Sequence, residues 1–232
     1  MRPAEAATAL EALELTGVDI QKVMKFFDTP ECPFKLSSLR ELVVAGIGTW
    51  NFLNGVGRIL EEAASSIETL IWLRPWIEHN LTGLEIEPPV DSRKLKSLRI
   101  LVFILTICEE QYDHLCDLLQ LVQVPENLER LVIVIDDTYN IPIFGAFTYD
   151  IDNGLHKYFG QLGKLRSIRI HLIMENLSRV DEIELETDAK LRAQFPTLDA
   201  TGKLSVSLGN WENPEDCAKA LARNERHNEI GR

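Results

Sequence analysis

The sequence has few cysteines and no excess of basic residues, and each shortage excludes a class of protein. The four cysteines, Cys32, Cys108, Cys116 and Cys217, show no paired spacing, so a disulfide framework is not expected in a chain of 232 residues. Lys and Arg number 24 against 36 Asp and Glu, a net charge of -12 without a basic stripe that could neutralise phosphates. We therefore expect reduced thiols and no nucleic-acid partner.

Long apolar runs are also missing. No segment approaches the roughly 18 consecutive apolar residues that a membrane-spanning helix needs. The start of the chain lacks the charged and then apolar regions of a secretory signal. We expect an intracellular, cytoplasmic chain that does not bind membranes, and the sequence does not separate the cytoplasm from the nucleus.

One short pattern recurs seven times along the chain. A leucine or isoleucine is followed by two residues, a second leucine or isoleucine, one residue and a third apolar side chain, although the last copy keeps only the second half. We call the middle apolar residue of each copy the anchor. The seven anchors are Leu13, Leu42, Leu70, Leu101, Leu131, Ile168 and Leu204. Their mean spacing of about 32 residues lies just above the roughly 20–29 residues of leucine-rich repeats.

The pattern predicts a short strand at each anchor. The anchor and the residue two positions later point to the same side of an extended chain, and the preceding leucine turns the corner. Segments with helical periodicity follow most of these strands, at residues 20–27, 50–64, 109–122, 155–162 and 185–195. Strand and helix therefore alternate, as a parallel sheet requires.

We accordingly predict an α/β fold, an irregular leucine-rich-repeat-like solenoid of about seven short parallel strands with helices on the convex side. The repeats would occupy residues 1–210, residues 211–232 would form a helical tail, and residues 81–86 are a candidate extra strand. Leucine-rich repeats normally carry an asparagine five residues after the anchor. Only Thr106 and Asp136 could take that role here, so we expect a solenoid without a polar ladder.

Three phrases resemble the irregular repeats of fungal F-box/leucine-rich-repeat proteins. They are Cys32-Pro-Phe34 before Leu36-Ser-Ser-Leu39, then Leu95-Lys-Ser-Leu98-Arg-Ile100, and Phe195-Pro-Thr-Leu198. In that family an N-terminal F-box docks on a cullin-ligase adaptor, and the repeats capture the protein to be ubiquitinated. The resemblance implies a protein-binding scaffold, the substrate-receptor half of such a protein. Residues 1–27 carry no Leu-Pro-x-Glu opening, so we do not expect an F-box in them.

An alternative function is a dinucleotide-dependent α/β enzyme. Gly46 and Gly48 follow an apolar strand and precede a helix, which is where a glycine turn brings backbone N–H groups to a pyrophosphate. Asn51 stands where the third glycine of that fingerprint belongs. Because the fingerprint is incomplete, a non-catalytic binding module remains the favoured function.

Other polar residues have simpler structural explanations. Asp136 and Asp137 follow an apolar strand, where turn capping is the simplest role. Cys108, His114 and Cys116 are spaced so that a helix would not bring all three to one face, and a structural zinc site needs a fourth ligand. We expect no catalytic residue, no cofactor and no bound metal.

The residues one and three positions after each anchor point away from the helices, onto the concave side of a solenoid. They are polar in the first repeat, apolar in the middle ones and polar again in the last two. An apolar surface on both sides of a sheet must be covered by something. We predict that this face binds a protein partner through Val43, Ile71, Leu73, Val102, Ile104, Val132, Val134, Arg169 and His171.

Three candidates could cover the concave face: a partner protein, a second copy of the chain, or the chain's own tail. In the tail, Asn213 and Pro214 favour a helix start, and Cys217, Ala218 and Leu221 follow as a thin apolar stripe. The first strand would also leave an open sheet edge, through which two copies could associate.

Overall fold

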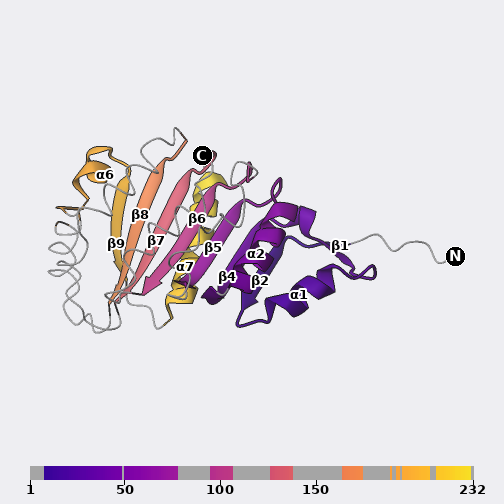
Figure 1. The fold of residues 1–232 in the computed structure, drawn as a ribbon. Coiled ribbons are helices and arrows are strands. Elements are labelled where there is room, and N and C mark those ends of the chain that lie inside the picture. The colour runs from indigo at the N-terminus through magenta and orange to yellow at the C-terminus, as the bar shows by residue number, and fades with distance from the viewer. Residues whose placement is uncertain are drawn as a thin grey trace.

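A computed structural model describes residues 8–48, 50–77, 95–106, 126–137, 164–174, 195–209 and 213–230, together with Ala189, Arg192 and Ala193. Its main sheet has seven parallel strands, which are β2 (Ala12–Thr16), β4 (Glu41–Gly48), β5 (Thr69–Ile77), β6 (Ile100–Thr106), β7 (Arg130–Asp137), β8 (Ser167–Met174) and β9 (Leu204–Gly209). They lie side by side in chain order (Figure 1). The predicted α/β class and its parallel sheet are confirmed.

The anchors form one continuous row across this sheet. In every neighbouring pair of strands the two anchors are register partners. A slip of one residue in any strand would have turned its apolar side chains to the other face. The alternation of apolar residues in the sequence therefore predicted both the strands and their register.

Helices α1 (Ile20–Phe27) and α2 (Trp50–Glu62) cover the face to which the anchors point (Figure 1). Asp19 starts α1, because its side chain accepts a hydrogen bond of 3.0 Å from the Gln21 N–H. Met24 of α1 and Val56 of α2 are buried in one core with the anchors. We call this side of the sheet the anchor face.

The helix predicted over residues 20–27 is confirmed at both ends, and the one predicted over residues 50–64 ends two residues earlier, at Glu62. The helices predicted over residues 109–122 and 155–162 and the strand predicted over residues 81–86 lie outside the described residues, as does most of the helix predicted over residues 185–195.

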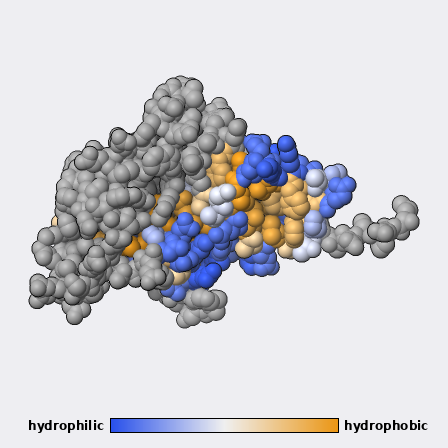
Figure 2. Space-filling model, turned by 90° about the horizontal axis from the view of Figure 1, so that it is seen from below, coloured by the Kyte–Doolittle hydropathy of each residue, from blue (hydrophilic) through white to orange (hydrophobic). Residues whose placement is uncertain are grey.

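Helix α7 (Pro214–Ile230) covers the opposite side of the sheet, over β5, β6 and β7. In Figure 1 it lies behind the strands, whereas α1 and α2 lie in front of them. Figure 2, which views the molecule from below, shows hydrophobic residues between two hydrophilic outer regions. The described part of the chain is therefore a sheet between helices, and none of its helices is long and apolar enough to cross a bilayer.

The other described elements are two short strands and two short helices. β1 (Thr8–Ala9) and β3 (Phe34–Lys35) form a separate two-stranded parallel sheet. The 3-10 helix η1 (Leu36–Ser38) precedes β4, and α6 (Pro196–Ala200) precedes β9. Gly17 after β2 has φ of 61° and Gly202 before β9 has φ of 67°, a left-handed conformation that glycine adopts without strain.

The strands are tied together where they begin. The N–H groups of Arg40 and Glu41 both donate to the carbonyl of Glu11, at 2.8 and 3.0 Å. Glu11 lies two residues before its anchor, and so do Arg40, Glu68, Arg99 and Glu129, whose carbonyls each accept two N–H groups from the next repeat in the same way. Each repeat therefore begins on a backbone acceptor that the previous repeat supplies.

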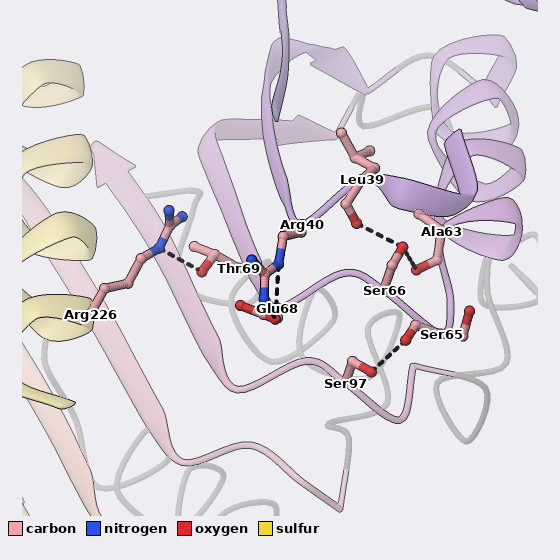
Figure 3. Close-up of polar contacts among 9 residues, drawn as sticks. All are labelled: Leu39, Arg40, Ala63, Ser65, Ser66, Glu68, Thr69, Ser97 and Arg226. Carbon is pink, nitrogen blue, oxygen red and sulfur yellow. Dashed lines mark hydrogen bonds and ion pairs between the residues drawn. The ribbon is translucent and has the colours of Figure 1, made fainter. Parts of the chain in front are cut away.

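A polar side chain four residues before the anchor adds a second link. Ser66 Oγ donates to the carbonyl of Leu39 at 2.8 Å, and Ser97 Oγ donates to the carbonyl of Ser65 at 2.7 Å (Figure 3). Asn127 continues the series by donating to a carbonyl of the preceding repeat. The absence of a polar ladder was predicted for the residues five positions after the anchors, and these contacts lie at another position, before the strands, for which no expectation was drawn from the sequence.

Replacement of Leu101 by alanine should lower the free energy of unfolding by about 3 kcal/mol, because this anchor is fully buried in the middle of the sheet. The same change at Leu13 should cost only about 1 kcal/mol, because Leu13 is half-buried in the first strand. Urea denaturation measures both values. Equal losses in the free energy of unfolding would contradict the difference in burial between the anchor of β6 and the anchor of β2.

Candidate binding face of the sheet

The apolar residues predicted to bind a partner lie together on the side of the sheet opposite the anchor face. We call this side the α7 face. Seven of the nine predicted residues belong to one buried cluster on it, and these are Val43, Ile71, Leu73, Val102, Ile104, Val132 and Val134. Ala45, Ile100 and Ile173 extend the same cluster, although the sequence analysis did not select them.

Helix α7 covers this cluster with small side chains. Cys217, Ala218 and Ala222 are buried against the strands, and Leu221 packs beside them. Short side chains let the helix axis approach the sheet closely, and they bury less apolar surface than leucines would. Of the three candidates for covering the face, the chain's own tail is the one that does so. Binding of a partner at this face stays a prediction, because α7 occupies it.

Buried charges hold the C-terminal half of α7 on β7 and β8. Glu225 accepts from Arg130 at 3.1 Å and lies 2.8 Å from Arg169. The side chains of Arg130 and Glu225 are only 10% and 8% exposed. The buried carboxylate of Glu225 thus lies between one buried arginine, Arg130, and one partly exposed arginine, Arg169, whose side chain is 30% exposed, and the pairing offsets the cost of burying Arg130 and Glu225.

A second set of polar contacts holds α7 on the first strands of the sheet. Arg226 donates to Glu41 and, at 3.1 Å, to the hydroxyl of Thr69 (Figure 3). Lys219 reaches Glu14 of β2 at 2.8 Å, and this hydrogen bond lowers the pKa of Glu14. The helix is therefore fixed by charge on both of its flanks as well as by apolar contact beneath it.

His171 is a buried histidine beside this helix-binding area. Its Nδ1 lies 2.8 Å from the hydroxyl of Ser207, and its Nε2 is buried and has no hydrogen-bond partner among the described residues. Burial, and then the positive charge of Arg169, lower the pKa of His171 from 6.5 to about 4. The ring is therefore neutral at physiological pH.

The apolar residues of this face were predicted from the sequence, whereas the charged residues that hold α7 on it were not. Glu41, Thr69 and Arg130 stand directly before their anchors and therefore point to the same face as Val43. A charge on an otherwise apolar face was the available signal. Of the predicted polar residues, Arg169 contacts α7 and His171 contacts β9.

The residues of the alternative enzyme reading do not form a turn. Gly46 and Gly48 lie within β4, and Gly48 is paired with Ile77 of β5. The strand order has no reversal, which is the feature that creates the nucleotide crevice of a doubly wound sheet. Thr106 and Asp136, the two residues that could have formed a polar ladder after the anchors, are strand residues and are register partners in β6 and β7.

Cys108, His114 and Cys116 lie outside the described residues. Within the part of the chain that is described, no group of three or more His, Cys, Asp or Glu side chains could hold a metal. Burial raises the pKa of the Cys217 thiol to about 12, so this cysteine is not a reactive nucleophile while α7 is in place.

Comparison with known proteins gives no relative for this chain: no protein family, no curated protein and no solved structure matches it. The face is therefore interpreted from its own geometry.

Replacement of Glu225 by alanine should lower the free energy of unfolding by about 3 kcal/mol, because it removes the carboxylate shared by Arg130 and Arg169. Replacement of Glu68, whose ion pair with Arg40 is much more exposed, should cost at most about 1 kcal/mol. Chemical denaturation of the two variants makes a matched comparison. A loss at Glu225 no larger than that at Glu68 would show that the buried cluster does not hold α7.

His171 should make the protein less stable in mild acid. Between pH 6.5 and about 4 the unfolded chain protonates this histidine and the folded chain does not, so the free energy of unfolding falls as the pH drops through this window. Above pH 6.5 the contribution is fully present. A His171→Asn variant should show a flatter pH dependence over this window, measured by denaturation at several pH values. Parallel curves for the two proteins would refute the assignment.

Proposed function

We propose that this chain is a non-catalytic protein-interaction module, an irregular leucine-rich-repeat-like solenoid whose α7 face is its binding face. The sequential strand order and the repeated strand-start contacts support a repeat architecture, because each unit bonds to its neighbours in the same way. The proposed role resembles that of the substrate-receptor repeats of F-box/leucine-rich-repeat proteins.

The observation that carries this proposal is that the α7 face already accommodates a helix. The small residues of α7 pack on an apolar strip along the middle strands. Charged groups on both sides of this strip form ion pairs with residues on the flanks of α7. Grooves that bind amphipathic helices have this composition of an apolar floor and polar borders. In this proposal α7 occupies the position that a helix of a partner protein takes.

The chemistry of the face defines the helix that it accepts. The helix needs small apolar side chains toward Val102 and Val132, an acidic residue toward Arg130 and Arg169, and a basic residue toward Glu41. A helix with the opposite order of charges would bring like charges together at buried positions, which is unfavourable.

An internal helix on the binding face weakens the apparent affinity for a partner, since only the fraction of molecules with α7 displaced can bind. Cys217 reports this fraction directly. It is fully buried on the side of α7 that faces the sheet, so a thiol reagent reaches it only after the helix has left the sheet.

The first test uses the full-length chain with Cys32, Cys108 and Cys116 replaced by serine. A synthetic peptide of residues 211–232 carrying Cys217→Ser is added in excess. The peptide should accelerate labelling of Cys217 severalfold, because it occupies the face whenever α7 leaves and thereby keeps the thiol exposed. Mass spectrometry of the labelled protein measures the rate.

A peptide of the same length carrying Glu225→Arg is the matched control. It should not accelerate labelling, because it brings a third cation toward Arg130 and Arg169. No acceleration by either peptide, or equal acceleration by both, would contradict a helix-specific face.

The second test addresses the partner. Proteins captured from cells by the full-length chain should be released by the first peptide and retained in the presence of the control peptide. Recovery of a cullin-ligase adaptor with them would extend the proposal to ubiquitination. Captured proteins that neither peptide releases would argue for a different binding surface.

A further inference from the structure

The outer edge of β2 is a second candidate interaction surface, separate from the α7 face. Among the described residues β2 pairs with β4 alone, and it forms one end of the main sheet (Figure 1). Ala12, Glu14 and Thr16 are exposed along it. An edge strand presents unpaired backbone groups that another strand can bond.

The direction of these backbone groups follows from one hydrogen bond. The N–H of Gly17 donates to the carbonyl of Ala45 in β4, at 3.3 Å. Because N–H groups alternate along a strand, those of Leu13 and Leu15 also point toward β4. The N–H groups of Ala12, Glu14 and Thr16 therefore point away from the sheet.

Apolar surface is left uncovered at the same end of the molecule. Leu10 and Leu13 of the first repeat are half-buried, whereas Leu39 and Leu42, which hold the same places in the second repeat, are fully buried. The exposed large hydrophobic residues of the described part are Val18, Phe26 and Phe34, with exposed fractions of 39%, 46% and 38%. All three lie within the first 34 residues, close to β2 in the sequence.

A row of alternating charges reaches β2 and stops there. Two positions before six of the seven anchors stand charged residues, which are Glu11, Arg40, Glu68, Arg99, Glu129 and Arg166. We call them the charge row. Within it Glu129 pairs with an arginine on each side, at 3.0 and 3.6 Å.

Glu11 is the end member of the charge row. Its neighbour Arg40 turns away from it and bonds Glu68 through both Nε and Nη2, at 3.1 and 2.7 Å. Among the described residues, the alternation of the charge row therefore ends at the sheet edge on a carboxylate, Glu11, with no next member of the row to supply a cation on its outward side.

We propose that the outer edge of β2 docks an extended segment of a partner protein, parallel to β2, with an arginine or lysine beside Glu11. Two apolar side chains of that segment, two and four residues after the basic one, would continue the rows of Leu13 and Leu15, and the first of them would cover the exposed surface of Leu13. This is strand addition, in which main-chain hydrogen bonds supply affinity and alternate side chains supply specificity.

A second copy of this chain fits the edge less well. In the described residues the two edge strands of the main sheet are β2 and β9. At the charge-row position β9 carries Gly202 and β2 carries Glu11 itself, so neither offers a cation to Glu11. Charge complementarity thus favours a partner strand that contains the basic residue.

The chain supplies its own probe for a test. Residues 164–172 contain Arg166 in the charge row, followed by Ile168 and Ile170 at the two apolar positions. A labelled peptide of these residues should bind the full-length chain about fivefold more tightly than the same peptide with Arg166→Glu. Fluorescence anisotropy measures both affinities.

Substitution of the exposed Glu11 by arginine should reverse this preference, so that the Arg166→Glu peptide binds more tightly. A folding defect cannot produce such a reversal. If both peptides bind both proteins equally, or neither peptide binds, the proposal is overturned.

An Ala12→Pro variant separates edge pairing from binding elsewhere. It removes an outward N–H and leaves the bonds to β4 in place, as prolines at sheet edges do. Binding of the Arg166 peptide should be lost while urea denaturation remains unchanged. Retained binding would mean that the peptide uses another surface, and self-association of the full-length chain that this proline abolishes would assign the edge to a second copy instead.

Discussion

The whole structure depends on the requirement that a parallel sheet with two apolar faces be covered on both. The middle strands are apolar in every direction, so neither face is stable in contact with water. At the first strands the anchor face is covered by α1 and α2, which follow β2 and β4 along the chain. In the described residues the α7 face is covered by a helix from the far end of the chain.

Charge determines where that distant helix lies. Apolar contact alone would let a helix with a stripe of small residues shift along the strip, because alanine side chains offer few distinct positions. Glu225 between two arginines and Arg226 on Glu41 allow one placement only. Buried ion pairs often add little net stability, because desolvation opposes their attraction, but a misplaced buried charge is costly. Here they act chiefly on position.

Much of the fold could be predicted from the sequence, because its signals are local. The period of two at Leu101 and Phe103 fixes which side faces the helices, and Asp19 and Asn213 mark helix starts within one or two residues. The segment that covers the α7 face could not be predicted from the sequence, which left three candidates. Arg130 and Glu225, which fix α7 in place, are 95 residues apart, and no local sequence pattern connects them. The links through Ser66 and Ser97 were not predicted for a different reason: these serines lie before the strands, whereas polar residues were sought only after them.

The alternation of the charge row gives the repeats a parity. Removal of one repeat, from Arg40 to Ile67, would place Glu11 beside Glu68, and insertion of a single repeat would likewise bring two like charges together at the new junction. Removal or insertion of two consecutive repeats restores opposite charges, since Glu11 would then meet Arg99. Changes of length by two repeats therefore keep opposite charges side by side in the charge row, whereas changes by one repeat do not.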